Sequence, residues 1–539
     1  MHASNRLAIS HYWVAFGLFL PAVVLGAWQM LVRSPLPAPL GDAGTYYASV
    51  TLHGTVMAYV VTTFFTMGFG YAVAATTLGR PIRGMTAAWV CFVICLIGTL
   101  MAAVTILAGK ASVLYTFYPP LLASGWYYGG AFLLIAGSMI WVALMVVNMA
   151  GWKRDHPGEP VPLAMFAITA TALLWAWAAS GVLLELAGIL LPRAFGWSDL
   201  IDAALGRTLF SVTLHAIVYF WLMPAYVAFY TLVPQVAGGR LYSDTMGRLT
   251  FIMFLVFSLP VGMHHLLADP EHGSGFKFLQ SFLTFLVALP TLLTVFSITA
   301  SLEIAGRHRG GRGRLGWIRA LPWDEPMVLA VGLSLVMLGF GGFGGLINMS
   351  YAMNAMIHNT SWVTAHFHLI FGGAVVIMYF AIAYEMWPRI TGKPLWSKRA
   401  ARWQLWLWFW GMLVTTIPWH IAGLMGQPRR VAIFDYSLPF VARMGPLVEI
   451  SVIGGFMLLV SAVLLIVILA RSHFGERALV EPLRYALAVN PPRSVPASLN
   501  GFGLWNRIVL VLMIAAYGYP IGQFFFIKSH SVPAVEATR

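Results

Sequence analysis

Charged side chains are scarce in this sequence. Asp, Glu, Lys and Arg make up 9% of its 539 residues, whereas 60% of the residues are apolar. Soluble globular proteins carry about 25% charged residues, so the scarcity excludes a soluble protein. The net charge of +14 is spread over short connections and forms no basic folded domain, which excludes a nucleic-acid-binding role. The sequence therefore predicts an all-α integral membrane protein.

Cysteine is nearly absent as well. Cys91 and Cys95 are the two cysteines, four positions apart inside an apolar segment, and we interpret them as a buried, reduced pair. The sequence thus has no disulfide framework and no C-x-x-C-H haem attachment site. No low-complexity segment occurs, and no polar region is large enough for a separate soluble domain, so we expect residues 1–539 to form a single membrane domain.

Long apolar runs take the place of charge. A membrane span needs about 20 mostly apolar residues, and the sequence predicts a bundle of about 13 such helices. They cover approximately 12–32, 46–75, 86–108, 125–150, 163–191, 207–235, 246–267, 276–303, 326–350, 360–388, 402–424, 446–470 and 504–528. The first is too long for a signal peptide, and no small-residue cleavage site follows it, so we expect it to be an uncleaved span.

The distribution of Lys and Arg predicts the orientation of this bundle. The N-terminus and the connections after even-numbered spans hold about 22 of the 32 basic residues, which the positive-inside rule places inside. We therefore expect the N-terminus inside and the C-terminus outside.

Six histidines share one predicted depth. In this topology all six lie within roughly 15 Å of the outer surface, at 1.5 Å per helical residue. Ionisable residues inside spans are functional candidates, and neutral imidazole is a common metal ligand, so the layer indicates a metal or haem cluster. The six residues are His53, His215, His264, His265, His366 and His368.

Spacing sorts these histidines. Residues two apart on a helix differ by about 200°, so His366 and His368 point to opposite faces and serve different metals. His264 and His265 differ by about 100° and converge only with help from another helix, which His215 gives. Three imidazoles with an open position suit a reactive copper. Tyr219 lies on the same helix face as His215.

The stretches "HAIVYFWLMPAYVAFYTLVPQVAGG", "MHHLLADP" and "HNTSWVTAHFHLIFGG" together resemble subunit I of the haem–copper oxygen reductases, with the B family, the ba3-type cytochrome c oxidases, as the best match. The resemblance implies an enzyme that oxidises cytochrome c, reduces oxygen to water at a high-spin haem and a copper, and translocates protons. It also implies that His53 and His368 are the axial ligands of a low-spin haem of b type. In the same way, His366 holds a high-spin haem of a type or a variant. His215, His264 and His265 bind copper, and Tyr219 is covalently cross-linked to His215.

The resemblance extends to the surroundings of the metals. Arg429, Arg430 and His358 match the groups that hold haem propionates, and Asp269 joins this outer polar layer. Tyr226 and Tyr230 follow Tyr219 on one helix face, and with Thr291 and Thr294 they match the family's K-type proton path. The implied partners are a subunit II with a binuclear copper centre, cytochrome c or a similar donor, a small accessory helix subunit and membrane lipid, in a bacterial or archaeal cell membrane.

Some features depart from this pattern. Asn354 stands where the B family is expected to have an aspartate near a propionate, which puts the pumping route or its stoichiometry in question. Glu185 is an intramembrane acid, and both a channel proton site and a partner-bonded acid are open. "GFGGFGGLINMS" has a loose glycine pattern, but it lies within an apolar span, so helix packing explains it better than nucleotide binding.

Two other functions compete with an oxidase. A nitric oxide reductase of the same superfamily lacks the tyrosine, so Tyr219 argues against it. A proton-coupled transporter, from a different class, favours broken helices and a site at the membrane midplane, whereas these histidines cluster towards one face. A visible spectrum of the purified protein separates a transporter from both enzymes, because a transporter has no haem bands.

Overall fold

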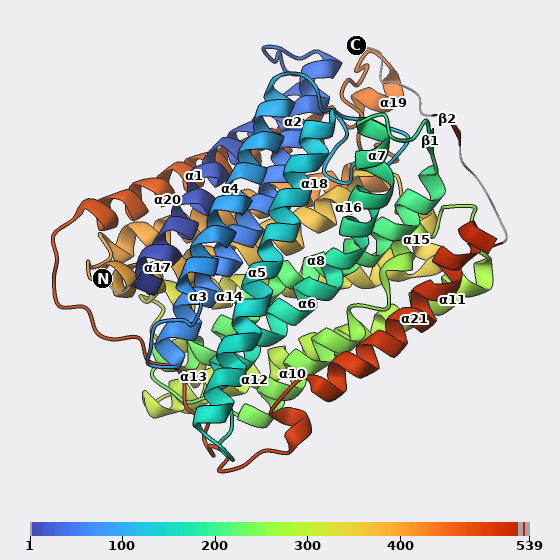
Figure 1. The fold of residues 1–539 in the computed structure, drawn as a ribbon. Helices are drawn as coiled ribbons and strands as arrows, with labels where there is room; N and C mark the ends of the chain where they lie inside the picture. Colours follow the sequence, from blue (N-terminus) through green and yellow to red (C-terminus); the bar gives the residue numbers. More distant parts are fainter. Residues whose placement is uncertain (1–2, 527–531, 534–539) are drawn as a thin grey trace.

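Long helices packed side by side form nearly all of the computed structural model, which describes residues 3–526 and 532–533. Figure 1 shows α2, α7 and α19 at one end of the bundle and α13 at the other. The α-helices are α1 (Ala3–Val32), α2 (Ala43–Thr55), α3 (Thr62–Thr77), α4 (Met85–Leu107), α5 (Gly125–Asp155), α6 (Leu163–Glu185), α7 (Leu191–Ala194), α8 (Ala203–Thr231), α9 (Val233–Val236), α10 (Asp244–Phe257), α11 (Ser274–Thr284), α12 (Ala288–His308), α13 (Gly316–Ala320), α14 (Pro326–Met349), α15 (Tyr351–Ile357), α16 (Ser361–Phe367), α17 (Val376–Thr391), α18 (Lys398–Leu424), α19 (Pro439–Ala442), α20 (Gly445–Phe474) and α21 (Gly503–Phe526).

Eleven helices among the described residues are long and apolar enough to cross a membrane. The two remaining predicted spans are helical in whole or in part: α18 covers 27 residues, and α10 covers 14 residues in the first half of its predicted span. The predicted all-α membrane bundle is therefore confirmed. The strands are the two-residue β1 (Leu200–Ile201) and β2 (Val532–Pro533), which pair antiparallel with Leu200 opposite Pro533.

Short irregular helices lie within the spans and in the connections between them. Three are π segments, in which the backbone winds more widely than in an α-helix: η1 (Val56–Val61), η2 (Leu186–Leu190) and η5 (His368–Val375). The others are 3₁₀ turns: η3 (Gly262–Leu266), η4 (Phe285–Val287) and η6 (Ala497–Leu499).

The expected continuous helix over 246–267 is wrong in its second half. The α-helix ends at Phe257, and the two histidines lie in η3. Pro260 explains the break, because proline has no backbone N–H and disfavours helical conformation in the residue before it. The two imidazoles are therefore presented by a tight turn and not by a helix face.

The helices that carry the other histidines begin at capping side chains. Asp42 accepts a hydrogen bond from the backbone of α2, Asp202 from that of α8 and Thr360 from that of α16. An N-cap satisfies backbone donors that the first turn leaves without partners. The caps fix where these helices start, at the end of the bundle predicted to face outside.

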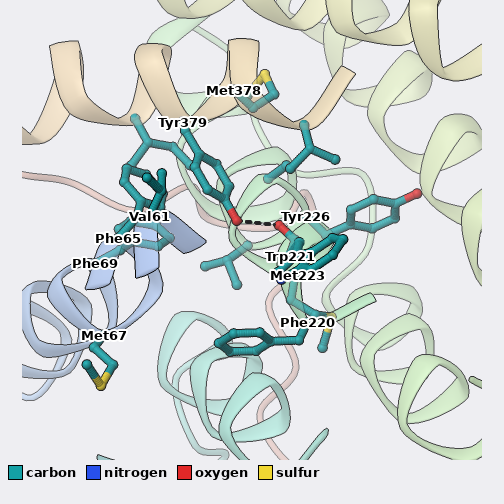
Figure 2. Close-up of a cluster of buried hydrophobic side chains, with 14 of the residues drawn as sticks. Val61, Phe65, Met67, Phe69, Phe220, Trp221, Met223, Tyr226, Met378 and Tyr379 are labelled. Carbon is teal, nitrogen blue, oxygen red and sulfur yellow. Dashed lines mark hydrogen bonds between the residues drawn. The ribbon is translucent and has the colours of Figure 1, made fainter. Parts of the chain in front are cut away.

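Aromatic packing joins α3, α8 and α17 below the histidine layer. In Figure 2 the Tyr379 hydroxyl donates a hydrogen bond to the carbonyl oxygen of Trp221, at 2.6 Å. The rings of Phe65 and Tyr379 stack with centroids 3.9 Å apart. These contacts bury large side chains and hold α8 against α17.

Candidate metal centre

Three imidazoles from two elements converge in the interior. The potential ligand atoms of His215 on α8 and of His264 and His265 on η3 all lie within 4.8 Å of one another. The ring centroid of His215 is 4.5 Å from that of His264 and 5.8 Å from that of His265. These separations let one ion reach all three rings.

A close backbone approach brings η3 to α8. A Cβ atom at Gly262 would lie 1.9 Å from the carbonyl oxygen of Ser211, so only glycine lets the turn approach α8 this closely. The Tyr517 hydroxyl on α21 accepts a hydrogen bond from the Gly262 N–H at 2.7 Å and donates one to the Leu259 carbonyl at 2.9 Å. Tyr517 thus bridges the break between α10 and η3.

The chemistry of this trio suits a metal. Nε2 of His215 and Nε2 of His265 are buried and have no hydrogen-bond partner within residues 3–526 and 532–533. Nδ1 of His264 donates to the Val261 carbonyl, which leaves its Nε2 available. Buried polar atoms without a partner are unfavourable, and imidazole nitrogen is a common copper ligand, so the residues fit a copper ion.

His53 on α2 and His368 at the start of η5 face each other. Their ring centroids are 6.3 Å apart and their planes differ by 16°. Nδ1 of His53 donates to the Ala22 carbonyl at 2.7 Å, and Nδ1 of His368 donates to the Thr364 carbonyl at 2.8 Å. Two imidazoles on one ion have nitrogens about 4 Å apart, because metal–nitrogen bonds are about 2.0–2.1 Å long, and each ring adds about 1 Å from nitrogen to centroid. The spacing therefore fits one bis-histidine iron.

His366 lies in the same segment but faces another helix. A Cβ atom at Gly344 on α14 would lie 2.5 Å from Nδ1 of His366, so the glycine makes room for this ring. The His368 ring instead lies 5.4 Å from the ring of Trp419 on α18. The two histidines therefore face different helices, and the α16–η5 segment separates their surroundings.

Tyr219 lies beside the trio. Its ring centroid is 4.8 Å from that of His215 and 5.5 Å from that of Phe254. The covalent bond to His215 implied by the resemblance stays a prediction.

Hydroxyl groups continue along α8 beyond Tyr219. The Tyr226 hydroxyl donates to Thr291 Oγ1 at 3.2 Å, and the Tyr230 hydroxyl donates to Thr294 Oγ1 at 3.3 Å. Tyr230 also hydrogen bonds to Thr250 Oγ1 at 2.9 Å. The structure thus pairs each tyrosine with a threonine of α12, and adds Thr250, which the sequence analysis missed.

Arg429, Arg430 and His358 lie close together in the outer connections. Burial and the neighbouring Arg430 lower the pKa of Arg429 to about 10. Nε of Arg429 is buried without a hydrogen-bond partner in the part of the chain that the structure describes. Arg430 has φ +63°, which is uncommon outside glycine, and its carbonyl accepts a hydrogen bond from the Tyr47 hydroxyl at 2.9 Å. A cationic pair with an unused N–H donor fits an anionic ligand such as a propionate.

Asn354 holds His358 in one tautomer. Nδ1 of His358 donates to the side-chain oxygen of Asn354 at 2.9 Å, and the Asn354 amide donates to the Asn348 carbonyl at 2.6 Å. Burial, Arg429 and Arg430 lower the pKa of His358 to about 4, so this imidazole is neutral at pH 7.

Asp269 joins a separate ion-pair cluster. Arg207 Nε lies 2.8 Å from Asp269 Oδ2, and Arg207 Nη2 lies 3.1 Å from Glu271 Oε1. The cluster ties the connection after η3 to the first turns of α8.

Arg33 is a further residue that the sequence analysis missed. It is buried, its guanidinium lies 5.5 Å from the Trp419 ring centroid, and Nη2 donates to the Pro428 carbonyl at 3.1 Å. The sequence does contain a signal for it, because an arginine at the outer end of the first span is contrary to the positive-inside rule. Tyr517 had a weaker signal, as a phenol inside the last span.

Comparisons with known proteins agree with this arrangement of histidines. Residues 6–457 match the family described as "Cytochrome C and Quinol oxidase polypeptide I". Cytochrome c oxidase subunit 1 of Thermus thermophilus is 39% identical over 493 residues, which cover 89% of this chain and 87% of that protein. Heme-copper oxidase subunit I+III of Aeropyrum pernix is 27% identical over 457 residues, covering 80% of this chain and 53% of that protein.

A solved structure is similar over the whole length. The cryo-EM structure of a heme-copper terminal oxidase dimer has a TM-score of 0.94 and 31% sequence identity, and the alignment covers 100% of this chain and 96% of that one.

Proposed function

Since the chain belongs to the cytochrome c and quinol oxidase polypeptide I family, as the catalytic subunit I of a haem–copper terminal oxidase, we propose the role of each residue in its centre. His215, His264 and His265 hold the copper, His366 holds the high-spin haem, and His53 and His368 hold the low-spin haem. The 39% identity to the Thermus protein supports a place in the B family. The convergence of three imidazoles carries this proposal, together with the buried nitrogens of two of them that have no partner among the described residues.

The family implies haems and a copper, and when bound they supply the electron transfer and the oxygen chemistry. The chain's own groups orient the histidine ligands and supply protons. Backbone carbonyls fix the tautomers of His53, His368 and His264, so that Nε2 is the ligand atom in each. Tyr219, whose ring centroid lies 4.8 Å from that of His215, donates a proton at its hydroxyl oxygen.

Protons for the reaction reach Tyr219 along α8. The pairs Tyr226–Thr291 and Tyr230–Thr294 supply hydroxyl groups that alternate as donors and acceptors. Proton transfer along such a series needs short hydrogen bonds and side-chain rotation. This path also serves the proton translocation that we propose for the enzyme.

Polar and charged side chains in the outer layer hold the haem propionates. Arg429, Arg430 and His358 contact the propionates, and the unused Nε of Arg429 is the donor best placed for this. We propose a low-spin haem of b type and a high-spin haem of a type or a variant.

Members of this family work with a subunit II and with cytochrome c. We propose that the subunit II of this enzyme carries a binuclear copper centre, that a small accessory helix completes the complex, and that residues 1–539 are one membrane domain. The chain is a membrane protein, and we propose the cell membrane of a bacterium or archaeon, with the N-terminus inside.

Oxygen consumption by the purified complex with reduced cytochrome c tests this function. We expect turnover that cyanide inhibits and that Tyr219→Phe lowers by at least about 100-fold, since positioned proton donors contribute about 10²–10⁴-fold. Consumption of nitric oxide with no oxygen reduction would instead establish the reductase. Absence of haem bands would exclude both enzymes.

A further inference from the structure

Glu185 is a buried acid that the centre described above does not use. It ends α6, its side chain is 0% exposed, and neither carboxyl oxygen has a hydrogen-bond partner among residues 3–526 and 532–533. Burying an unpaired carboxylate is very unfavourable. The group therefore needs a proton to neutralise it, which leaves the partner-bonded acid without support.

The backbone beside Glu185 is also unusual. The π segment η2 begins at Leu186, directly after it. The two other π segments of the described residues adjoin the proposed low-spin haem ligands, since η5 begins at His368 and η1 begins three residues after His53. Single-turn π segments are frequent at functional sites. Glu185 thus shares a backbone feature with residues that bind a ligand.

The carboxyl group faces α8 at its outer end. A Cβ atom at Gly206 would lie 3.4 Å from Glu185 Oε1 and 2.6 Å from Cγ of Pro119. Gly206 precedes His215 by about 14 Å along the helix, at 1.5 Å per residue. Glu185 therefore lies outward of the histidine trio, next to the connection between α4 and α5.

Phenols surround the acid on three elements. Glu185 interacts electrostatically with Tyr59 of η1, Tyr118 of the α4–α5 connection and Tyr128 of α5. No ion pair among the described residues includes Glu185. The Arg430 guanidinium lies 6.0 Å from the Tyr118 ring centroid. Tyr118 therefore connects Glu185 with the Arg429–Arg430 pair.

We propose that Glu185 is a proton-exchange site in the outer half of the protein, coupled through Tyr118 to the arginine pair. In this step the carboxylate oxygen takes up one proton and later releases the same proton outward, and no other bond forms or breaks. Reduction of the metal centre adds negative charge that favours uptake, and reoxidation favours release. The inference rests on the proposed proton-translocating oxidase and adds a site to it.

Infrared difference spectra of the holoenzyme, reduced minus oxidised, test the site directly. We expect a carboxylic-acid carbonyl band that shifts in D2O, disappears in Glu185→Gln and moves to another frequency in Glu185→Asp. The matched control is Glu303→Gln, because the Glu303 side chain is half-buried and pairs with Arg307. The same band in Glu185→Gln, or no such band in the wild type, would overturn the proposal.

Proton release from reconstituted vesicles gives the second readout. We expect Glu185→Gln and Tyr118→Phe to release at least twofold fewer protons per electron while they still reduce oxygen, and Glu185→Asp to restore release. Unchanged release in Glu185→Gln would overturn this inference alone, whereas a wild type that does not reduce oxygen would overturn the proposed function. If Glu185→Gln does not assemble, Glu185→Asp decides, since an exchanging carboxyl must still change its band.

Discussion

The imidazole of His53 lies almost parallel to that of His368, with ring centroids 6.3 Å apart and both Nδ1 atoms bonded to backbone carbonyls. This centroid separation fits one ion held between the two rings. A Cβ atom at Gly26 on α1 would lie 3.1 Å from the His53 ring, so the small residue lets α1 support this ring. The ligand geometry thus depends on neighbours in two further helices, α1 and α16.

Loss of one imidazole from the trio should abolish copper binding while both haems stay. His264→Ala is expected to lower copper content below one tenth and turnover by at least about 100-fold, since even outer-shell changes cost 10–100-fold. Metal analysis and haem spectra measure this. His308→Ala is the control, because His308 is exposed at the end of α12. Full copper content with oxygen reduction in His264→Ala would contradict the assignment.

Position 344 should tolerate only glycine, because the His366 ring lies where a larger side chain would begin. Gly344→Ala is expected to displace the His366 ring and to lower occupancy or shift the spectrum of the high-spin haem, because the new Cβ would lie 2.5 Å from Nδ1. Gly342→Ala on the same helix meets no atom within 4 Å and should be neutral, or stabilising by up to about 1 kcal/mol. Equal haem spectra of the two variants would argue against this packing.

Removal of a hydroxyl from the tyrosine–threonine series should slow proton delivery. Tyr226→Phe and Thr294→Val are each expected to slow oxygen reduction about tenfold with unchanged haem and copper content, since proton transfer contributes about 10²–10⁴-fold and part of the series remains. Stopped-flow oxidation of the reduced enzyme measures this rate. Tyr242→Phe serves as the control because Tyr242 is exposed. Wild-type rates in both variants would exclude this path.

Tyr517 should keep η3 in position. Tyr517→Phe leaves the buried Gly262 N–H and Leu259 carbonyl without this partner, which costs about 1–3 kcal/mol. We expect a lower unfolding temperature and reduced copper retention during dialysis against a chelator. Tyr519→Phe, two residues along α21 and exposed, should retain copper as the wild type does. Equal retention in the two variants would show that Tyr517 does not position the ligands.

A carboxylate at position 354 should make His358 titrate. In the wild type, burial, Arg429 and Arg430 lower the pKa of His358, and the neutral Asn354 amide adds no charge that would offset this. In Asn354→Asp the new anion favours the imidazolium and raises this pKa, so the ring gains a proton as the pH falls towards 5.5. We expect proton release per electron to become pH-dependent in Asn354→Asp and to stay flat in the wild type. Two identical profiles would contradict this role of Asn354.

The membrane bundle and the six histidines of the candidate site could be predicted from the sequence, because apolar spans and histidines inside them are local signals. Helix periodicity placed Tyr226 and Tyr230 on the helix face of Tyr219, whereas Thr291 and Thr294 were expected beside them only from the resemblance to the family's proton path. The tight turn at His264 was missed because the effect of Pro260 was not weighed against a long apolar run.

Other parts of the site depend on contacts between distant residues. Tyr517 reaches Gly262 across more than 250 residues, and Arg33 reaches Pro428 across 395. No local pattern encodes such pairs. The π segments are equally hidden, because a one-residue widening of a helix leaves the apolar pattern nearly unchanged.

Metal analysis of the purified wild-type chain, with a reduced-minus-oxidised pyridine haemochrome spectrum, tests the central claim most directly. One copper and two haems per chain, with one haem in a six-coordinate low-spin state, is the predicted result. A chain without haem bands, or with two haems and no copper, would contradict the proposal that the six histidines bind two irons and a copper.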